Sequence, residues 1–335
     1  MRRFRFLSRL VLFLLILSLP LTLGSCELIN RLFPDLDLGD LFSPPSYTEI
    51  TADNFVRTYS DQLSPNEMAV YEALLPLSAG ELSVSPTLAE IPAVCQDRSP
   101  TDEEKEALSA KLGYWISNAL YAFKLDHPEY FWIDFTDFSY EYSLKSDEGG
   151  TVRLASFKVN LAAEASVTDA PALAAALAKA TADFAPTGNT VKEKVAYIDK
   201  YLCDRITYDL NAPHRSNLIG ALVDGKCVCE GYAHAFYYLC QKAGVDVVCI
   251  PGYAKANGKT EGHMWNGVFI DGVLYGVDTT WNDSTGERKY LLVGSDTEVH
   301  EGTFGETHTT DMLLLSGNTK PFALPQISKT AYAGN

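Results

Sequence analysis

Apolar residues return every three or four positions in the segment that follows Ser99, which is the spacing of one helix face. Thr101 and Glu104 open this segment as a capping box, in which each side chain satisfies an otherwise unpaired backbone amide. The apolar positions are Leu108, Leu112, Trp115 or Ile116, Ala119 and Phe123. The pattern predicts a helix that ends near His127 and Pro128.

Alternation of apolar and polar positions predicts two strands, from Phe131 to Ser143 and from Thr151 to Leu161. The turn-forming sequence D-E-G-G at 147–150 lies between them, so the strands should form a hairpin. An Ala-rich stretch from Asp169 to Phe184 predicts a further helix. We interpret residues 49–185 as an N-terminal α+β region that carries no recognisable chemical motif.

Helical spacing returns in the second half of the chain. Thr190 and Glu193 form another capping box before an apolar helix face that continues to Leu202. A second helix runs from Cys229 to a stop at Gly244. Cys229 therefore lies at a helix N-terminus, where unpaired amides and the helix dipole favour a negatively charged sulfur. The same amides can stabilise an oxyanion.

A second hairpin is predicted over residues 261–281, because Asp271-Gly272 is a strong two-residue turn signal between apolar runs. With that turn, Trp265 lies opposite Asp278 on the facing strand. His263 and Asp278 then share one face of the sheet as diagonal neighbours, ~7–8 Å apart at Cα. Side chains can close that gap.

The first residues have the pattern of an export signal. Four arginines, Arg2, Arg3, Arg5 and Arg9, precede the apolar segment 10–23, which is shorter than the ~20 residues of a membrane span. The following Leu-Gly-Ser-Cys at 23–26 resembles the bacterial lipobox. We therefore expect a signal peptide at 1–25, a lipid on Cys26 and a tether over 26–48. This predicts anchoring to the outer face of a bacterial cell membrane; an ordinary signal peptide is the alternative.

Composition limits the possible functions of the 335-residue chain. It is 47% hydrophobic and 11% aromatic, which excludes a disordered protein. The 27 basic and 43 acidic residues give a net charge of −16, which disfavours nucleic acid as a partner. The only membrane attachment that we expect is the lipid.

A catalytic triad can be assembled from Cys229 as nucleophile, His263 as base and Asp278 as the group that orients the base. The histidine would keep the cysteine as a thiolate, and the aspartate would fix the imidazole tautomer. The three local motifs are C-E-G-Y-A, G-H-M-W-N and V-D-T-T-W. In this order they resemble the transglutaminase-like superfamily.

The resemblance covers roughly 190–295 and implies an α+β, papain-like core in which a helix bearing the cysteine packs on an antiparallel sheet bearing histidine and aspartate. We assign residues 186–335 to this domain, after the smaller region 49–185. The resemblance also implies acyl chemistry at an amide carbonyl through a Cys229 thioester, without a cofactor. Water would then give a peptidase and an amine would give crosslinking; we favour water slightly.

The expected partner is a protein or peptide substrate, with cell-wall peptide as one compatible class. Motif position suggests that Tyr232, Trp265 and Trp281 surround the triad and bind substrate, although packing alone explains them equally well. Tyr208 is a guess for the oxyanion hole. A non-catalytic surface binding or scaffold protein that retains the fold is the alternative function.

Other residues are weaker candidates for chemistry. Cys227 fits the motif less well than Cys229, and one intervening residue is too few for a zinc knuckle, so we expect no metal site. We expect no required disulfide among the cysteines after Cys26. The remaining histidines lack the hairpin partner of His263, and His308 in particular lies in a stretch rich in Gly and Thr with no partner pattern.

Overall fold

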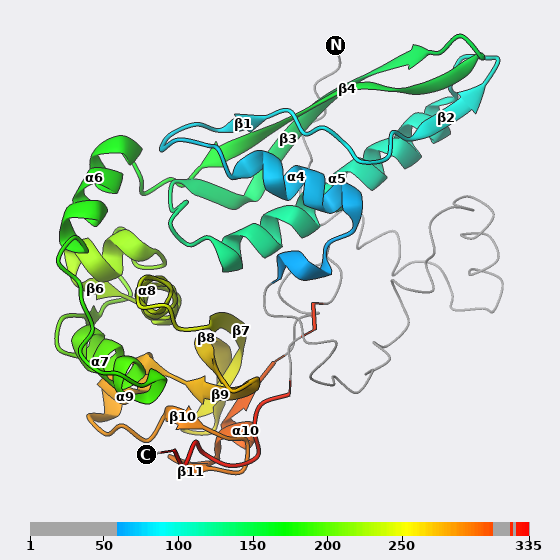
Figure 1. The fold of residues 1–335 in the computed structure, drawn as a ribbon. Coiled ribbons are helices and arrows are strands. Elements are labelled where there is room, and N and C mark those ends of the chain that lie inside the picture. The colour runs from blue at the N-terminus through cyan, green and yellow to red at the C-terminus, as the bar shows by residue number, and fades with distance from the viewer. Residues whose placement is uncertain (1–58, 311–321, 324–325, 335) are drawn as a thin grey trace.

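The computed structural model describes residues 59–310, 322–323 and 326–334. The expected signal peptide at 1–25, the lipidation site Cys26 and the tether at 26–48 lie outside the described residues. Within the described ranges, no helix is both long and apolar enough to cross a membrane. The molecule mixes helices and sheets in two parts that lie one above the other in Figure 1.

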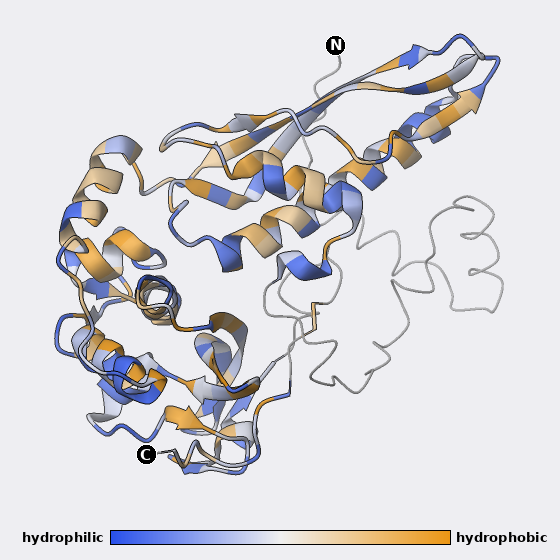
Figure 2. Ribbon diagram, in the orientation of Figure 1, coloured by the Kyte–Doolittle hydropathy of each residue, from blue (hydrophilic) through white to orange (hydrophobic). Residues whose placement is uncertain are grey.

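The N-terminal part is a long antiparallel hairpin with helices packed along it (Figure 1). Its helices are η2 (Ser60–Gln62), α4 (Pro65–Leu74) and α5 (Asp102–Asp126), and its strands are β1 (Ser83–Val84), β2 (Ala93–Gln96), β3 (Ile133–Ser146) and β4 (Thr151–Ala163). Thr101 and Glu104 form the predicted capping box. Hydrophobic and hydrophilic residues are interspersed along α5 (Figure 2), as the helical spacing in the sequence predicts.

The C-terminal part is a five-stranded sheet flanked by helices. The helices are α6 (Ala170–Ala180), α7 (Val191–Cys203), η3 (Gly220–Asp224), α8 (Cys229–Lys242), α9 (Thr279–Thr285) and α10 (Phe304–Thr307). The sheet has the order β10-β9-β8-β7-β13, with bounds Leu291–Val293, Val273–Val277, Lys259–Ile270, Val247–Ala256 and His308–Thr309. Short pairs join β5 (Thr207–Tyr208) to β6 (Lys226–Cys227) and β11 (Glu298–Val299) to β12 (Gly302–Thr303).

The predicted hairpin register is confirmed where the strands pair. Ile270 lies opposite Val273, and pairing continues to Asn266 opposite Val277. Asp271 and Gly272 both have positive φ, as a tight primed turn requires.

The expectation that Asp278 continues this strand is wrong. β9 ends at Val277, and Asp278 is the N-cap of α9, so Trp265 and Asp278 do not pair. The physical reason is the cap itself, because Asp278 Oδ1 accepts the Trp281 N–H at 3.1 Å and starts a helix.

One hydrophobic core extends through both parts of the molecule. The end of α5 lies against α8, where the Tyr237 hydroxyl donates to the backbone oxygen of Asp126 at 2.9 Å. Beside it, Lys124 of α5 pairs with Glu230 of α8 at 2.7 Å, and the two side chains are 33% and 23% exposed. The N-terminal part is therefore tied to the helix that begins with Cys229.

Lys124→Met should lower the free energy of unfolding, because Glu230 then loses its partner in a partly buried position. We expect a loss of about 1–3 kcal/mol, measured by urea denaturation. The matched control is Lys105→Met on the same helix, whose exposed pair with Asp102 should contribute at most about 1 kcal/mol. Equal losses in the two variants would contradict a structural role for the Lys124–Glu230 pair.

Candidate active site

Cys229 is the first residue of α8 and is partly exposed. The start of the helix lies close to its neighbours, since a Cβ on Gly231 would come within 2.8 Å of the Arg215 carbonyl and 2.9 Å of the Cys227 sulfur. This close packing fixes the position of the helix start. Cys227 is fully buried, and burial raises the pKa of its thiol, which agrees with the choice of Cys229 as nucleophile.

His263 of β8 and Asp278 are brought together as the sequence predicted, although Asp278 comes from a helix cap. His263 Nε2 lies 2.7 Å from Asp278 Oδ2. The aspartate side chain is fully buried and the histidine side chain is 8% exposed. Because Nε2 is engaged by the carboxylate, Nδ1 is the ring nitrogen left for Cys229, whose side chain acts to raise the pKa of the His263 ring.

The electrostatics of this group favour an ion pair. Burial acts to lower the pKa of His263, but the Asp278 carboxylate and the Cys229 side chain outweigh it and raise the pKa to about 10. Burial acts to raise the pKa of Asp278, but the two histidines beside it hold that pKa well below its usual range. The imidazole is therefore protonated and the carboxylate ionised near neutral pH.

A second histidine, His308, belongs to this site, and the sequence interpretation missed it. Its Nε2 lies 3.1 Å from the same Asp278 oxygen, and its side chain is fully buried. His308 comes from β13, which pairs with β7 at the edge of the sheet opposite Ala254. A two-residue strand leaves no periodicity in the sequence, so no local signal pointed to this contact.

Among the described residues, His263, Asp278 and His308 form a group whose composition could hold a metal ion. Both ring nitrogens lie at hydrogen-bond distance from one carboxylate oxygen, 2.7 Å and 3.1 Å. Each contact is accounted for by a hydrogen bond in which a ring N–H donates to the carboxylate oxygen. Cys227 and Cys229 are not part of the group, and all six cysteines of the described chain are free thiols.

Of the three aromatic residues that we expect to bind substrate, Trp265 and Trp281 lie beside the His263 ring, whereas the hydroxyl of Tyr232 contacts Asp283. Tyr232 is 1% exposed and donates its hydroxyl to Asp283 at 2.6 Å, and Trp265 is 3% exposed. Trp281 is partly exposed, with its ring centroid 5.6 Å from that of His263. Tyr232 and Trp265 are buried and pack in the protein interior, whereas part of Trp281 is exposed and accessible to a ligand.

Tyr208, on β5, lies beside the nucleophile. Burial of part of the ring raises the pKa of its hydroxyl, and Cys229 is among the neighbouring groups that affect that pKa. The side chain is nevertheless 46% exposed.

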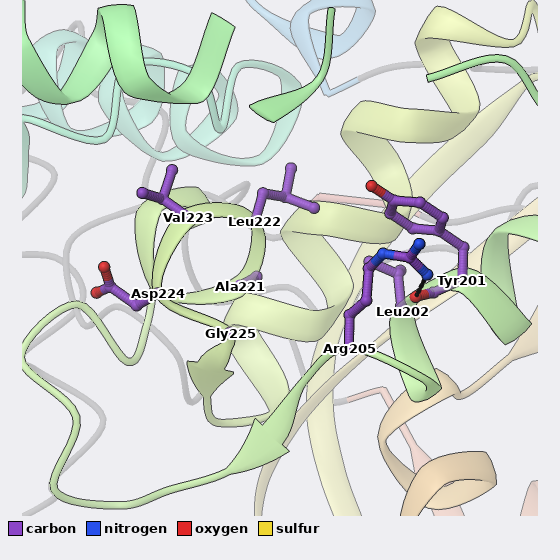
Figure 3. A pocket seen from close by; sticks show the side chains of 8 residues that line it. All are labelled: Tyr201, Leu202, Arg205, Ala221, Leu222, Val223, Asp224 and Gly225. Carbon is purple, nitrogen blue, oxygen red and sulfur yellow. Dashed lines mark hydrogen bonds between the residues drawn. The ribbon is translucent and has the colours of Figure 1, made fainter. Parts of the chain in front are cut away.

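A separate hollow of about 230 Å³ lies between α7 and η3 (Figure 3). Its polar lining includes Arg205, whose guanidinium stacks over the Tyr201 ring at 3.8 Å. The lining contains none of the triad residues, so the hollow is not the site of the chemistry described above.

Comparisons with known proteins cover the part of the chain that contains the site. Residues 176–281 match the model of the transglutaminase-like superfamily, and this range contains Cys229, His263 and Asp278. The kyphoscoliosis peptidase of Mus musculus is 29% identical over 158 residues, covering 42% of this chain and 24% of its own length. The Homo sapiens kyphoscoliosis peptidase is 32% identical over 112 residues, 30% of this chain and 17% of that protein. The chain thus spans a quarter or less of these relatives.

Two solved structures are also similar. A crystal structure of a TGase has 18% identity and a TM-score of 0.27, covering 42% of this chain and 44% of that one. The periplasmic domain of TgpA from Pseudomonas aeruginosa has 14% identity and a TM-score of 0.24, with 44% and 64% covered. Residues 176–281 thus match a transglutaminase-like domain, and this part of the chain contains Cys229, His263 and Asp278.

Proposed function

We propose that the protein is a cysteine acyl-transfer enzyme that acts on an amide carbonyl. The observation that carries this proposal is the 2.7 Å contact between His263 Nε2 and Asp278 Oδ2, with Cys229, at the start of α8, near enough to raise the pKa of the same ring. A buried carboxylate that holds a protonated imidazole against a thiol is the arrangement that activates a cysteine nucleophile.

The proposed reaction has two steps. In the first, the Cys229 thiolate adds to the amide carbon, and His263 gives its proton to the departing amine, so that a C–N bond breaks and a thioester forms. In the second, His263 takes a proton from the incoming water as its oxygen attacks the thioester, which releases an acid and restores the thiolate. An amine in place of water would give a new amide.

The developing oxyanion needs hydrogen-bond donors. The backbone N–H of Cys229 at the helix start is our first candidate. Tyr208 is our candidate for a second donor, because this partly exposed residue lies near Cys229 and its hydroxyl carries a proton.

We favour hydrolysis over amine transfer, in part because the curated relatives are named peptidases. The substrate would be a peptide or protein, with the exposed part of Trp281 forming one wall of its site. We further propose that the protein acts outside the cell, anchored by a lipid on Cys26; the arginines before the short apolar segment and the Leu-Gly-Ser-Cys sequence support this location. Cell-wall peptide is a substrate class compatible with it.

Alkylation of Cys229 tests the proposed activation without a substrate. With iodoacetamide at pH 6, we expect Cys229 to be labelled about ten-fold faster than Cys95, a free thiol on β2 that has no histidine partner among the contacts described. In His263→Ala the advantage of Cys229 should disappear while the rate at Cys95 stays constant. Peptide mapping of the label measures both. Equal rates in the wild type would favour the non-catalytic binding protein.

The pH dependence of the His263 ring gives a second test. We expect its NMR signals in the wild type to titrate at about pH 10, because the Asp278 carboxylate stabilises the charged ring. In Asp278→Asn the pKa should fall toward the ordinary value of about 6.5, since burial is then opposed by the Cys229 side chain alone. His127 and His214, which contact Glu129 and Asp224, serve as controls whose signals should not change between the two proteins.

The raised pKa of His263 also fixes the sign of its contribution to stability. The contribution is fully present below about pH 6.5, where the ring of the unfolded chain is also protonated, and is lost as the pH rises through about 10. Denaturant unfolding of the wild type should therefore show stability decreasing across this window. The decrease should be smaller in Asp278→Asn, and an identical pH dependence in the two proteins would contradict the ion pair.

The location is tested by Cys26→Ser in a bacterial host. We expect the wild type to fractionate with membranes and to incorporate labelled fatty acid, and the variant to do neither, because the thiol is the atom that carries the lipid. Cys95→Ser should behave as the wild type. Incorporation of fatty acid by Cys26→Ser would contradict lipid attachment at this residue.

A further inference from the structure

The Asp278 carboxylate accepts further hydrogen bonds besides the one from His263. Its Oδ1 accepts the Trp281 N–H at 3.1 Å, and its Oδ2 is shared by His263 at 2.7 Å and His308 at 3.1 Å. His308 lies 27 residues beyond the end of the range matched by the superfamily model, which is residue 281. The third contact is thus supplied by a part of the chain that the family match does not cover.

The contacts of His308 engage both of its ring nitrogens. An ionised carboxylate only accepts hydrogen bonds, so His308 Nε2 must carry the proton that points at Asp278. His308 Nδ1 lies 3.0 Å from the Thr307 hydroxyl, whose single proton also lies within reach of the Thr303 and Phe304 carbonyls, at 3.0 Å and 3.2 Å between oxygen atoms. Burial lowers the pKa of His308 despite the nearby carboxylate, so the ring is neutral and has one N–H. Neither nitrogen is left to act on a thiol or a substrate.

Aromatic packing holds the His308 ring in this orientation. The Phe304 ring is stacked on it at 4.1 Å between centroids, with the planes 15° apart. Trp281 and Trp265 meet it edge to face at 4.7 Å and 5.0 Å. A ring flip would break both hydrogen bonds inside a fully buried pocket.

We propose that His308 is a positioning residue of the active site, which donates a hydrogen bond to Asp278 so that the carboxylate stays ionised and aimed at His263. The inference rests on the proposed function. Without this donor, the buried carboxylate would lose one of three hydrogen bonds, and its ionised form would be less stable. His263 would then be held less firmly against Cys229.

The first test is ¹⁵N NMR of the ring nitrogens in the wild-type protein at neutral pH, which requires no substrate and no variant. We expect His308 to be protonated at Nε2 alone and His263 to be protonated at both nitrogens. A His308 ring that is protonated at Nδ1 alone, and therefore cannot donate from Nε2, would overturn the proposal whether or not the protein is active.

The second test compares iodoacetamide labelling of Cys229 in three variants. His308→Phe keeps an aromatic ring but removes the donor, and should slow labelling at pH 6 about ten-fold. His308→Gln, whose amide can reach the position of Nε2, should recover most of the rate. His300→Phe is the matched control, because His300 is a partly exposed histidine that stacks on Tyr290 outside the triad. It should label as the wild type.

The outcomes separate the two proposals. Fast wild-type labelling that persists in a folded His308→Phe would overturn the role of His308 and leave the proposed function standing. Slow wild-type labelling that is insensitive to His263→Ala would remove the proposed function, and with it the role of His308 in catalysis. If His308→Phe does not fold, the ring-nitrogen measurement on the wild type still decides the hydrogen bond, and His308→Gln decides its effect on Cys229.

Discussion

The burial of the Asp278 carboxylate is the constraint on which the rest of the site depends. An ionised group without solvent contact is stable only where the fold provides donors and a counter-ion. Here α9 supplies a backbone N–H, β8 supplies His263 and β13 supplies His308. One side chain therefore sets the relative positions of three elements that are separate in the sequence, and the same contacts align the imidazole for chemistry.

The nucleophile is positioned by a different set of contacts. Cys229 is positioned by the start of α8. The next residue of that helix, Glu230, forms an ion pair with Lys124 of the N-terminal part. A second buried carboxylate, Asp199, receives Asn282 of α9 at 3.0 Å and so joins α7 to the helix that Asp278 caps. Burial raises the pKa of Asp199 to about 6, so this anchor is more costly to ionise than an exposed one.

Much of this arrangement could be predicted from local patterns. Capping boxes marked the starts of two helices, and the Asp271-Gly272 turn fixed the register of the hairpin as far as Val277. Beyond that residue the prediction failed, because Thr279 and Thr280 have strand propensity while the Asp278 side chain starts a helix instead. His308 could not be predicted, since its contact with Asp278 is created by the pairing of β13 with β7, far away in the sequence.

The position of His308 near the end of the described chain has a consequence for biosynthesis. A polypeptide is made from its N-terminus, so Cys229, His263 and Asp278 all exist before the residues that form β13. Until then the sheet ends at β7 on that side, and the carboxylate lacks its second imidazole. A nascent or truncated chain that stops short of residue 308 would contain the complete triad and yet lack the group that we propose positions Asp278, which would delay reactivity at the thiol until residue 308 has been made and β13 has paired.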